Sequence, residues 1–107
     1  MSAVVEPLHL SAPAALKMIR ELAADTERIV VIRYAQKRKI PRRQIERCVQ
    51  KGDIAEGPFR NVKGNWQVNL YRRAAGEELT CVVVIDWAAK VLVINAFRPK
   101  ESLRRQR

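Results

Sequence analysis

Basic side chains gather on one predicted helix, at a spacing that suits contact with phosphate groups. Arg43, Arg47 and Lys51 lie four residues apart and therefore share one helical face. Guanidinium and ammonium groups bind phosphate oxygens through charge-assisted hydrogen bonds. Glu46 is the one acid between residues 33 and 51, whereas a face that serves only solubility mixes both signs. The spacing favours a polyanionic ligand, and a solvated helix face is the alternative.

The positive charge of the chain is concentrated in two segments. Residues 33–51 hold eight lysines or arginines, residues 98–107 hold five against one acid, and the formal net charge of the chain is +10. Such concentrated charge on a small domain points first to nucleic acid, and we expect RNA or a nucleoprotein as the partner. The nucleic-acid contacts that we predict are Lys37, Arg38, Lys39, Arg42, Arg43, Arg47, Lys51, Tyr71 and Arg73.

The last two of these contacts come from a second polar stripe, on a predicted strand. Alternation places Trp66, Val68, Leu70 and Arg72 on one face and Gln67, Asn69, Tyr71 and Arg73 on the other. A tyrosine ring can stack on a base, and asparagine and arginine can hydrogen-bond phosphates or base edges. An ordinary solvent-facing strand is the alternative interpretation.

Residues that commonly catalyse hydrolysis are scarce. The sole histidine, His9, lies near the start of the chain, so no Ser-His-Asp set can form. Cys48 and Cys81 with one histidine cannot supply a zinc site, and we expect neither metal nor cofactor. Cleavage of RNA through its 2′-OH stays open, because arginine, lysine and tyrosine can position a phosphate and stabilise charge. An enzyme of this composition would be a metal-independent endoribonuclease.

Two helices and a run of strands must position these side chains. Ser11 begins a helix that ends near Asp25, and Pro41 begins a second helix that Gly52 ends. Residues 33–39 form a polar connector or a short helical turn. Strands are predicted at 29–32, 54–59, 66–72, 79–85 and 91–97. Short turns favour antiparallel neighbours, so we expect an α+β fold: two helices packed on one face of a curved, three- to four-stranded antiparallel sheet.

The length of the chain, 107 residues, suits one domain. We expect a flexible leader at 1–10, the α+β domain at 11–98 and a basic tail at 99–107. The longest apolar run, Cys81–Ile85, is too short to span a membrane, and the N-terminus lacks a signal peptide. Two cysteines without a disulfide pattern are typical of packed, reduced thiols. These features predict a cytoplasmic protein without a membrane partner, either monomeric or homo-oligomeric.

Four stretches of the chain resemble one family. They read LSAPAALKMIRELAADTERI, IPRRQIERCVQKGDIAEGP, KGNWQVNLYRRAAGEELTCVVVID and VLVINAF, and together they span Leu10 to Phe97. They are similar to domain-of-unknown-function family 4258, a small uncharacterised bacterial family that is common in mobile elements. The most specific pieces are KGDIAEGP, KGNWQVNL and AGEEL. The family is similar in layout to RelE- and BrnT-type toxins, which are small basic ribonucleases, so the resemblance implies a RelE-like layout; fold analogy alone is a weak guide to function.

The chain departs from this family at one position that bears on catalysis. Family members usually carry a histidine, followed by a longer basic helix, before the segment that matches Ile40. Here Tyr34 stands at the histidine position, or Val30 does in an alternative alignment. If the histidine is catalytic, the resemblance implies an inactive or repurposed protein. If it is structural, a RelE-like site stays open, with Tyr34 and Arg38 as candidate catalytic residues.

We therefore expect a small basic protein of a bacterial mobile element that binds nucleic acid, RNA in particular, without strong catalysis. A RelE/BrnT-like toxin ribonuclease with an antitoxin partner is one alternative. A phage- or plasmid-encoded inhibitor that binds another protein is the other.

Overall fold

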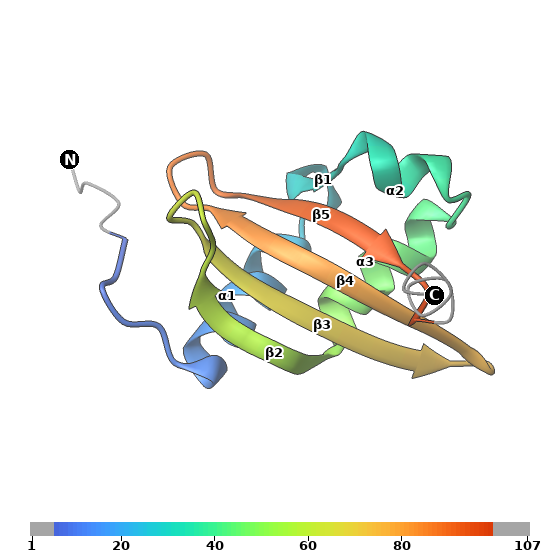
Figure 1. The fold of residues 1–107 in the computed structure, drawn as a ribbon, viewed down its shortest axis with the longest axis horizontal. Helices are drawn as coiled ribbons and strands as arrows, with labels where there is room; N and C mark the ends of the chain where they lie inside the picture. The colour runs from blue at the N-terminus through green and yellow to red at the C-terminus, as the bar shows by residue number, and fades with distance from the viewer. Residues whose placement is uncertain (1–5, 100–107) are drawn as a thin grey trace.

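A computed structural model describes residues 6–99 of the chain, except for the side chain of Tyr34. These residues form three α-helices, one short 3₁₀ helix and five strands (Figure 1). The helical elements are α1 (Ala12–Ala23), η1 (Thr26–Arg28), α2 (Arg33–Lys37) and α3 (Arg42–Lys51). The strands are β1 (Ile29–Val31), β2 (Asp53–Arg60), β3 (Trp66–Ala74), β4 (Glu77–Asp86) and β5 (Val91–Phe97). The predicted basic tail lies outside the described residues, apart from Pro99, as do residues 1–5 of the predicted leader.

The helix boundaries follow the capping signals in the sequence. Ser11 precedes α1, and its side-chain oxygen accepts a hydrogen bond from the Ala14 N–H at 3.2 Å. Pro41 precedes α3, and Gly52 follows it. Residues 33–37, predicted as a connector or a helical turn, form α2. No helix among residues 6–99 is long and apolar enough to cross a membrane.

The sheet is mixed, with the strand order β1-β5-β4-β3-β2. The four strands from β2 to β5 form the antiparallel meander that the short turns predict, and β4 is central. β1 adds a fifth strand by pairing parallel to β5, where Ile29 lies opposite Leu92. The α+β class is confirmed, but the prediction of a purely antiparallel sheet of three to four strands with two helices matches only in part. The parallel pair joins segments about sixty residues apart, and no local pattern signals such a partner.

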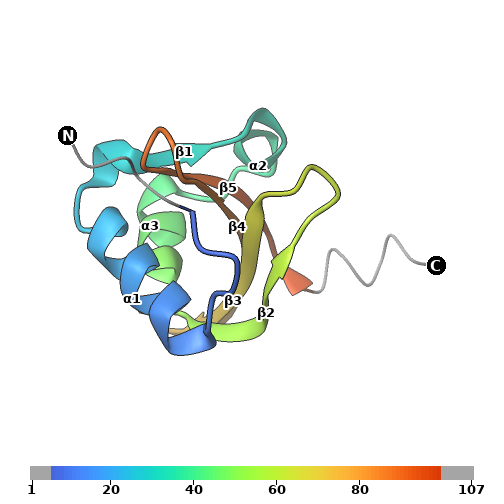
Figure 2. The ribbon, with the colours of Figure 1, turned by 90° about the vertical axis from the view of Figure 1, so that its left-hand side faces the viewer.

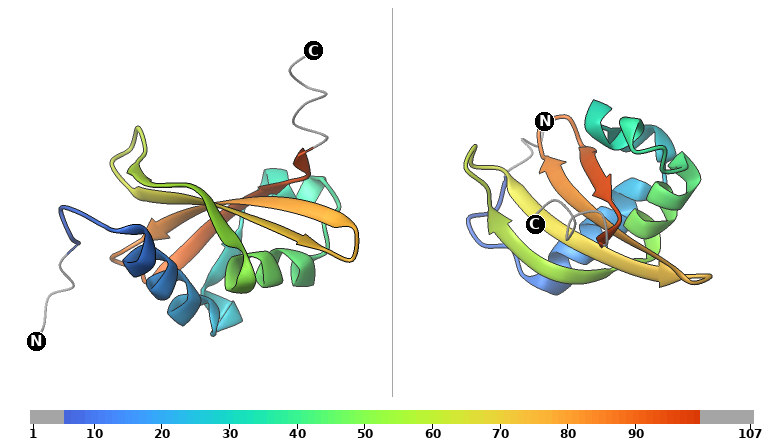
Figure 3. Two further views of the ribbon diagram at one scale, coloured as in Figure 1. Left: turned by 90° about the horizontal axis from the view of Figure 1, so that it is seen from below. Right: turned by 45° about the vertical axis from the view of Figure 1, so that its right-hand side comes forward.

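The structure has one helical layer. Figures 2 and 3 show α1 and α3 on the same side of the sheet. Their buried side chains, among them Ile19, Ile45 and Val49, pack against the apolar face of the strands, which carries Val68 and Ile94. Burial of this face supplies the main stabilisation of the domain. Among the described residues, no helix covers the opposite face of the sheet.

A tight turn fixes the end of the β3–β4 hairpin. Ala75 and Gly76 form the turn with φ angles of 54° and 79°, and Ala74 pairs with Glu77 on either side of it. Positive φ at both central residues is typical of the two-residue hairpin turn whose twist matches that of the strands. The turn places Glu77 at the first position of β4, on the same face of the sheet as the buried Leu79.

Arg60 and Trp66 anchor the segment that precedes α1. The Trp66 Nε1–H donates to the Pro7 carbonyl at 3.1 Å, and an Arg60 Nη2–H donates to the same oxygen at 3.0 Å. Arg60 also pairs with Glu6 at 3.2 Å and lies 4.3 Å from the centre of the Trp66 ring. Residues 6 and 7 of the predicted leader are therefore in contact with the domain.

Candidate nucleic-acid interface

Helix α3 presents three sides to its surroundings. Ile45, Cys48 and Val49 form its buried stripe. One flank carries Arg42 and Glu46, and we call it the inner flank. The other carries the solvent-exposed Arg43, Arg47 and Lys51, and we call it the groove flank. The 3.6-residue period of the helix separates these flanks although their residues alternate in sequence.

The inner flank is occupied by internal contacts. Arg42 donates to the Glu46 carboxylate at 2.8 Å, to the Thr26 carbonyl at 3.0 Å and to the Ile29 carbonyl at 2.7 Å. These bonds join α3 to η1 and to the start of β1. Arg42, one of the predicted nucleic-acid contacts, therefore has a structural role on the inner flank.

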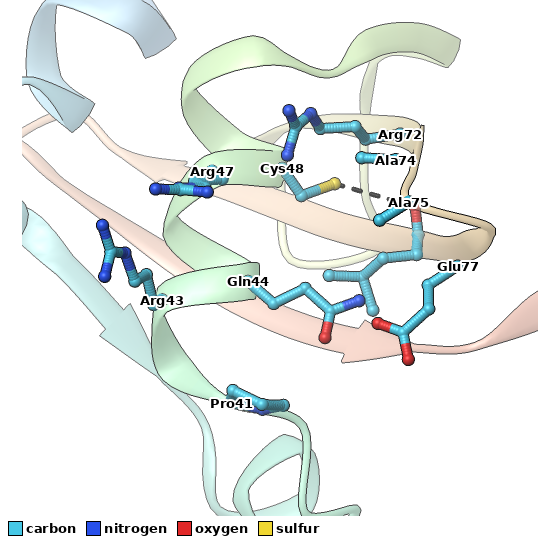
Figure 4. Close-up of a pocket in the computed structure, with 10 residues that line it drawn as sticks. Pro41, Arg43, Gln44, Arg47, Cys48, Arg72, Ala74, Ala75 and Glu77 are labelled. Carbon is cyan, nitrogen blue, oxygen red and sulfur yellow. Dashed lines mark hydrogen bonds between the residues drawn. The ribbon is translucent and has the colours of Figure 1, made fainter.

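A groove of about 300 Å³ lies between α3 and the β3–β4 hairpin, next to the groove flank. Its lining residues are Pro41, Arg43, Gln44, Arg47, Cys48, Arg72, Ala74, Ala75, Glu77 and Leu79. Figure 4 shows Gln44 and Cys48 pointing from α3 toward the hairpin, whereas Arg43 and Arg47 extend from the other side of the helix. The groove has an apolar floor and a charged, polar rim.

Three arginines on this rim have no internal partner. Within residues 6–99, Arg43, Arg47 and Arg72 make neither an ion pair nor a hydrogen bond, and Glu77 is the one acid among the lining residues. Arg43 and Arg47 come from α3, and Arg72 comes from β3. Unpaired guanidinium groups from two elements around one groove are suited to binding an anion.

The two cysteines lie together beneath the groove. The Cys48 thiol donates to the Leu79 carbonyl at 3.7 Å (Figure 4). Both cysteines are buried. The hydrogen bond from the Cys81 thiol lowers the pKa of Cys48. Burial of the thiol opposes this shift, and the positive charge of Arg72 adds to it. The hydrogen bond with Cys48, together with burial, raises the pKa of Cys81. Exposed fractions of 1% and 0% favour packing over nucleophilic chemistry, in agreement with the expected packed thiols.

The basic residues upstream of α3 are divided between two environments. Lys37 ends α2, and Lys39 is exposed in the connector to α3. Arg38 turns inward, and its Nη1 group donates to Asn95 Oδ1 at 3.0 Å and to the Ala96 carbonyl at 3.2 Å. These bonds bind α2 to β5 beyond the end of β1. Tyr34, the other candidate catalytic residue, lies in α2, and its side chain is outside the described part of the structure.

Tyr71 and Arg73 lie on the opposite face of the sheet from the groove. The Tyr71 hydroxyl donates to Glu78 at 2.6 Å, and this hydrogen bond raises the pKa of Tyr71. Arg73 is exposed next to it. The structure therefore separates these two predicted contacts from the groove flank by the thickness of the sheet.

Sequence reasoning missed three charged or amide side chains of the groove: Arg72, Gln44 and Glu77. Arg72 carried a usable signal, because alternation puts it on the same face as the buried Val68 and Leu70. A charged residue at the end of a core-facing stripe must find an anion or reach solvent. Gln44 and Glu77 carried no such signal, because only the packing of α3 beside the hairpin brings them together.

The described residues hold no cluster of the side chains that usually bind a metal ion. Among residues 6–99, no group of three histidine, cysteine or acidic side chains could hold a metal ion. His9 is exposed, and the residues that line the groove include no histidine.

Comparison with known proteins identifies a family without a described activity. Comparisons with curated proteins and with solved structures gave no match, so the RelE-like layout stays a prediction. The model of one protein family, described as a domain of unknown function (DUF4258), matches residues 30–98. The match runs from β1 to the residue after β5 and includes all the residues that line the groove, whereas α1 precedes it. The chain belongs to the DUF4258 family.

Proposed function

We propose that this protein binds nucleic acid, RNA in particular, through the groove flank of α3 and Arg72. The observation that carries the proposal is the set of three arginines, Arg43, Arg47 and Arg72, that line one groove and have no partner within residues 6–99. Unpaired guanidinium groups are strongly solvated, and phosphate oxygens replace that water with charge-assisted hydrogen bonds.

The geometry of α3 supports a phosphate backbone as the ligand. Arg43, Arg47 and Lys51 repeat at four residues, which corresponds to a rise of about 6 Å per step along the helix axis. A chain of phosphates offers negative charges at a regular spacing, whereas a small anion needs only one of these cations. The net charge of +10 adds long-range attraction to the same kind of ligand.

The test is a binding titration with a fluorescent, unstructured RNA, followed by anisotropy at several salt concentrations. The Arg43→Ala/Arg47→Ala variant removes two unpaired cations from the groove flank. We expect its affinity to fall about 100-fold at low salt, at about tenfold per charged contact. The slope of log K against log salt should become shallower by about 1.4, because each lost contact with a single strand contributes about 0.7.

The matched control is Lys17→Ala/Lys63→Ala, which removes the same charge from two exposed positions, on α1 and in the β2–β3 loop. This control should lose less than threefold in affinity, because long-range charge alone acts on it. Equal losses of RNA affinity in the two variants would mean that net charge alone attracts the RNA and that no defined site binds it. Failure of the unmodified protein to bind RNA or DNA would falsify the proposed function.

A further inference from the structure

The groove beside α3 offers more than positive charge. Its floor is apolar, formed by the side chains of Cys48, Ala74 and Leu79, and its volume of about 300 Å³ is at the lower end of the range for small-ligand sites. A space of this size suits one small planar group, and a nucleic-acid duplex is far too wide to enter it. The arginines stand at the rim of this space, so a ligand would place its anionic part outside and its uncharged part inside.

Two polar side chains face each other across the groove. Figure 4 shows the Gln44 amide, from α3, directed toward the Glu77 carboxylate, which follows the hairpin turn. Neither side chain has a hydrogen-bond partner within the described residues. The tight turn at Ala75 and Gly76 fixes the start of β4 and therefore the backbone from which Glu77 extends. Both groups are available to a ligand in the groove.

The chemistry of this pair selects among the bases. A carboxylate only accepts hydrogen bonds, so Glu77 requires N–H donors, and the Gln44 amide both donates and accepts. Adenine, cytosine and guanine carry an exocyclic amino group, whereas uracil and thymine carry carbonyl oxygens instead. A carbonyl oxygen opposite Glu77 would bring two acceptors together and leave both unsatisfied. The pair therefore suits a base with an amino group.

We infer that the groove holds one unpaired base of a single-stranded nucleic acid, selected by Glu77 and Gln44 for its exocyclic amino group. The base would lie on the apolar floor with a flanking phosphate at Arg72, and the strand would continue across α3 to Arg43 and Arg47. This inference rests on the proposed function, since the same arginines hold the backbone. It adds a substrate class, single strands, and a base preference that charge alone does not produce.

The test compares oligo(A), oligo(C) and oligo(U) RNA of equal length and label at one salt concentration. We expect oligo(A) and oligo(C) to bind about tenfold more tightly than oligo(U), within the range for one well-placed base contact. Glu77→Gln should reduce this preference to less than twofold, because an amide can donate to the uracil carbonyl. The same comparison with DNA oligomers, in which thymine replaces uracil, shows whether RNA or DNA binds the groove more tightly.

The control is Glu78→Gln, which removes the same charge one residue away, on the opposite face of the sheet. Both variants should gain affinity from the lost negative charge, but only Glu77→Gln should lose the base preference. Equal binding of the three oligomers to the unmodified protein, or an unchanged preference in Glu77→Gln, would overturn the inference and leave the proposed function standing. Absence of binding to single strands and duplexes alike would overturn the proposed function itself.

Discussion

The two flanks of α3 carry arginines that are neighbours in sequence and opposite in role. On the inner flank, Arg42 donates to a carboxylate and to two backbone carbonyls, at 2.7 to 3.0 Å. On the groove flank, Arg43 and Arg47 have no such partner among the described residues, and they line a groove together with a third unpaired arginine, Arg72. The same residue type stabilises the fold on one flank and is available to a ligand on the other.

This difference shows that charge density is a poor guide to a binding site unless the internal acceptors are known. A guanidinium whose donors are used by carbonyls would have to give up those bonds to reach a phosphate. Arg38 belongs with Arg42 in this respect, because it donates to Asn95 and Ala96 on β5. Among the basic residues between positions 33 and 51, Arg38 and Arg42 are therefore structural, whereas Arg43 and Arg47 are available to a ligand.

The strongest test of the comparison is Arg42→Ala beside Arg43→Ala. Arg42→Ala should lower the free energy of unfolding by about 1.5 kcal/mol, because the Thr26 and Ile29 carbonyls lose a charged donor. Arg43→Ala should change it by less than about 0.5 kcal/mol, as exposed, unpaired positions usually do. Urea denaturation measures both values. In RNA anisotropy, Arg43→Ala should lose more affinity than Arg42→Ala. A larger loss of RNA affinity in Arg42→Ala would contradict the distinction between the flanks.

Arg38→Ala gives a smaller effect and tests the candidate catalytic role. We expect a loss of about 1 kcal/mol in the free energy of unfolding, because two hydrogen bonds to β5 disappear. The variant also removes a buried Nε–H that has no partner among the described residues, which offsets part of this loss. RNA affinity should stay within twofold of the unmodified protein. A stable variant with weakened RNA binding would place Arg38 in the binding surface instead.

The smallest expected effect concerns Tyr71, on the opposite face of the sheet. Its hydrogen bond to Glu78 raises its folded-state pKa above the unfolded value, so the stabilisation is present below the unfolded pKa of about 10 and is lost as pH rises through the folded pKa. Tyrosinate absorbance in a Tyr34→Phe background reports Tyr71 alone, because the chain has two tyrosines. Glu78→Gln should lower the pKa of Tyr71. It should not change the loss of RNA affinity that Arg43→Ala causes at neutral pH. An unshifted titration would show that the bond does not persist in solution.

Much of the secondary structure was predictable because its causes are local. Ser11, Pro41 and Gly52 mark the helix ends where the structure has them, and alternation correctly separated Val68 and Leu70 from Tyr71. The parallel pairing of β1 with β5 was not predictable in the same way, since it depends on a contact between distant segments. The groove was predictable only in part: helical spacing predicts the stripe that holds Arg43 and Arg47, whereas Gln44 and the hairpin side depend on tertiary packing.

The sequence by itself determined which side chains share a helix face or a strand face, because backbone periodicity depends only on near neighbours. It thereby determined the basic stripe of Arg43, Arg47 and Lys51. Only the tertiary structure decided which cations are used internally, because the acceptors of Arg42 and Arg38 lie on other elements. It also decided that Arg72 and Glu77 stand beside α3, since that position requires the helix to pack on one face of a sheet built from distant strands.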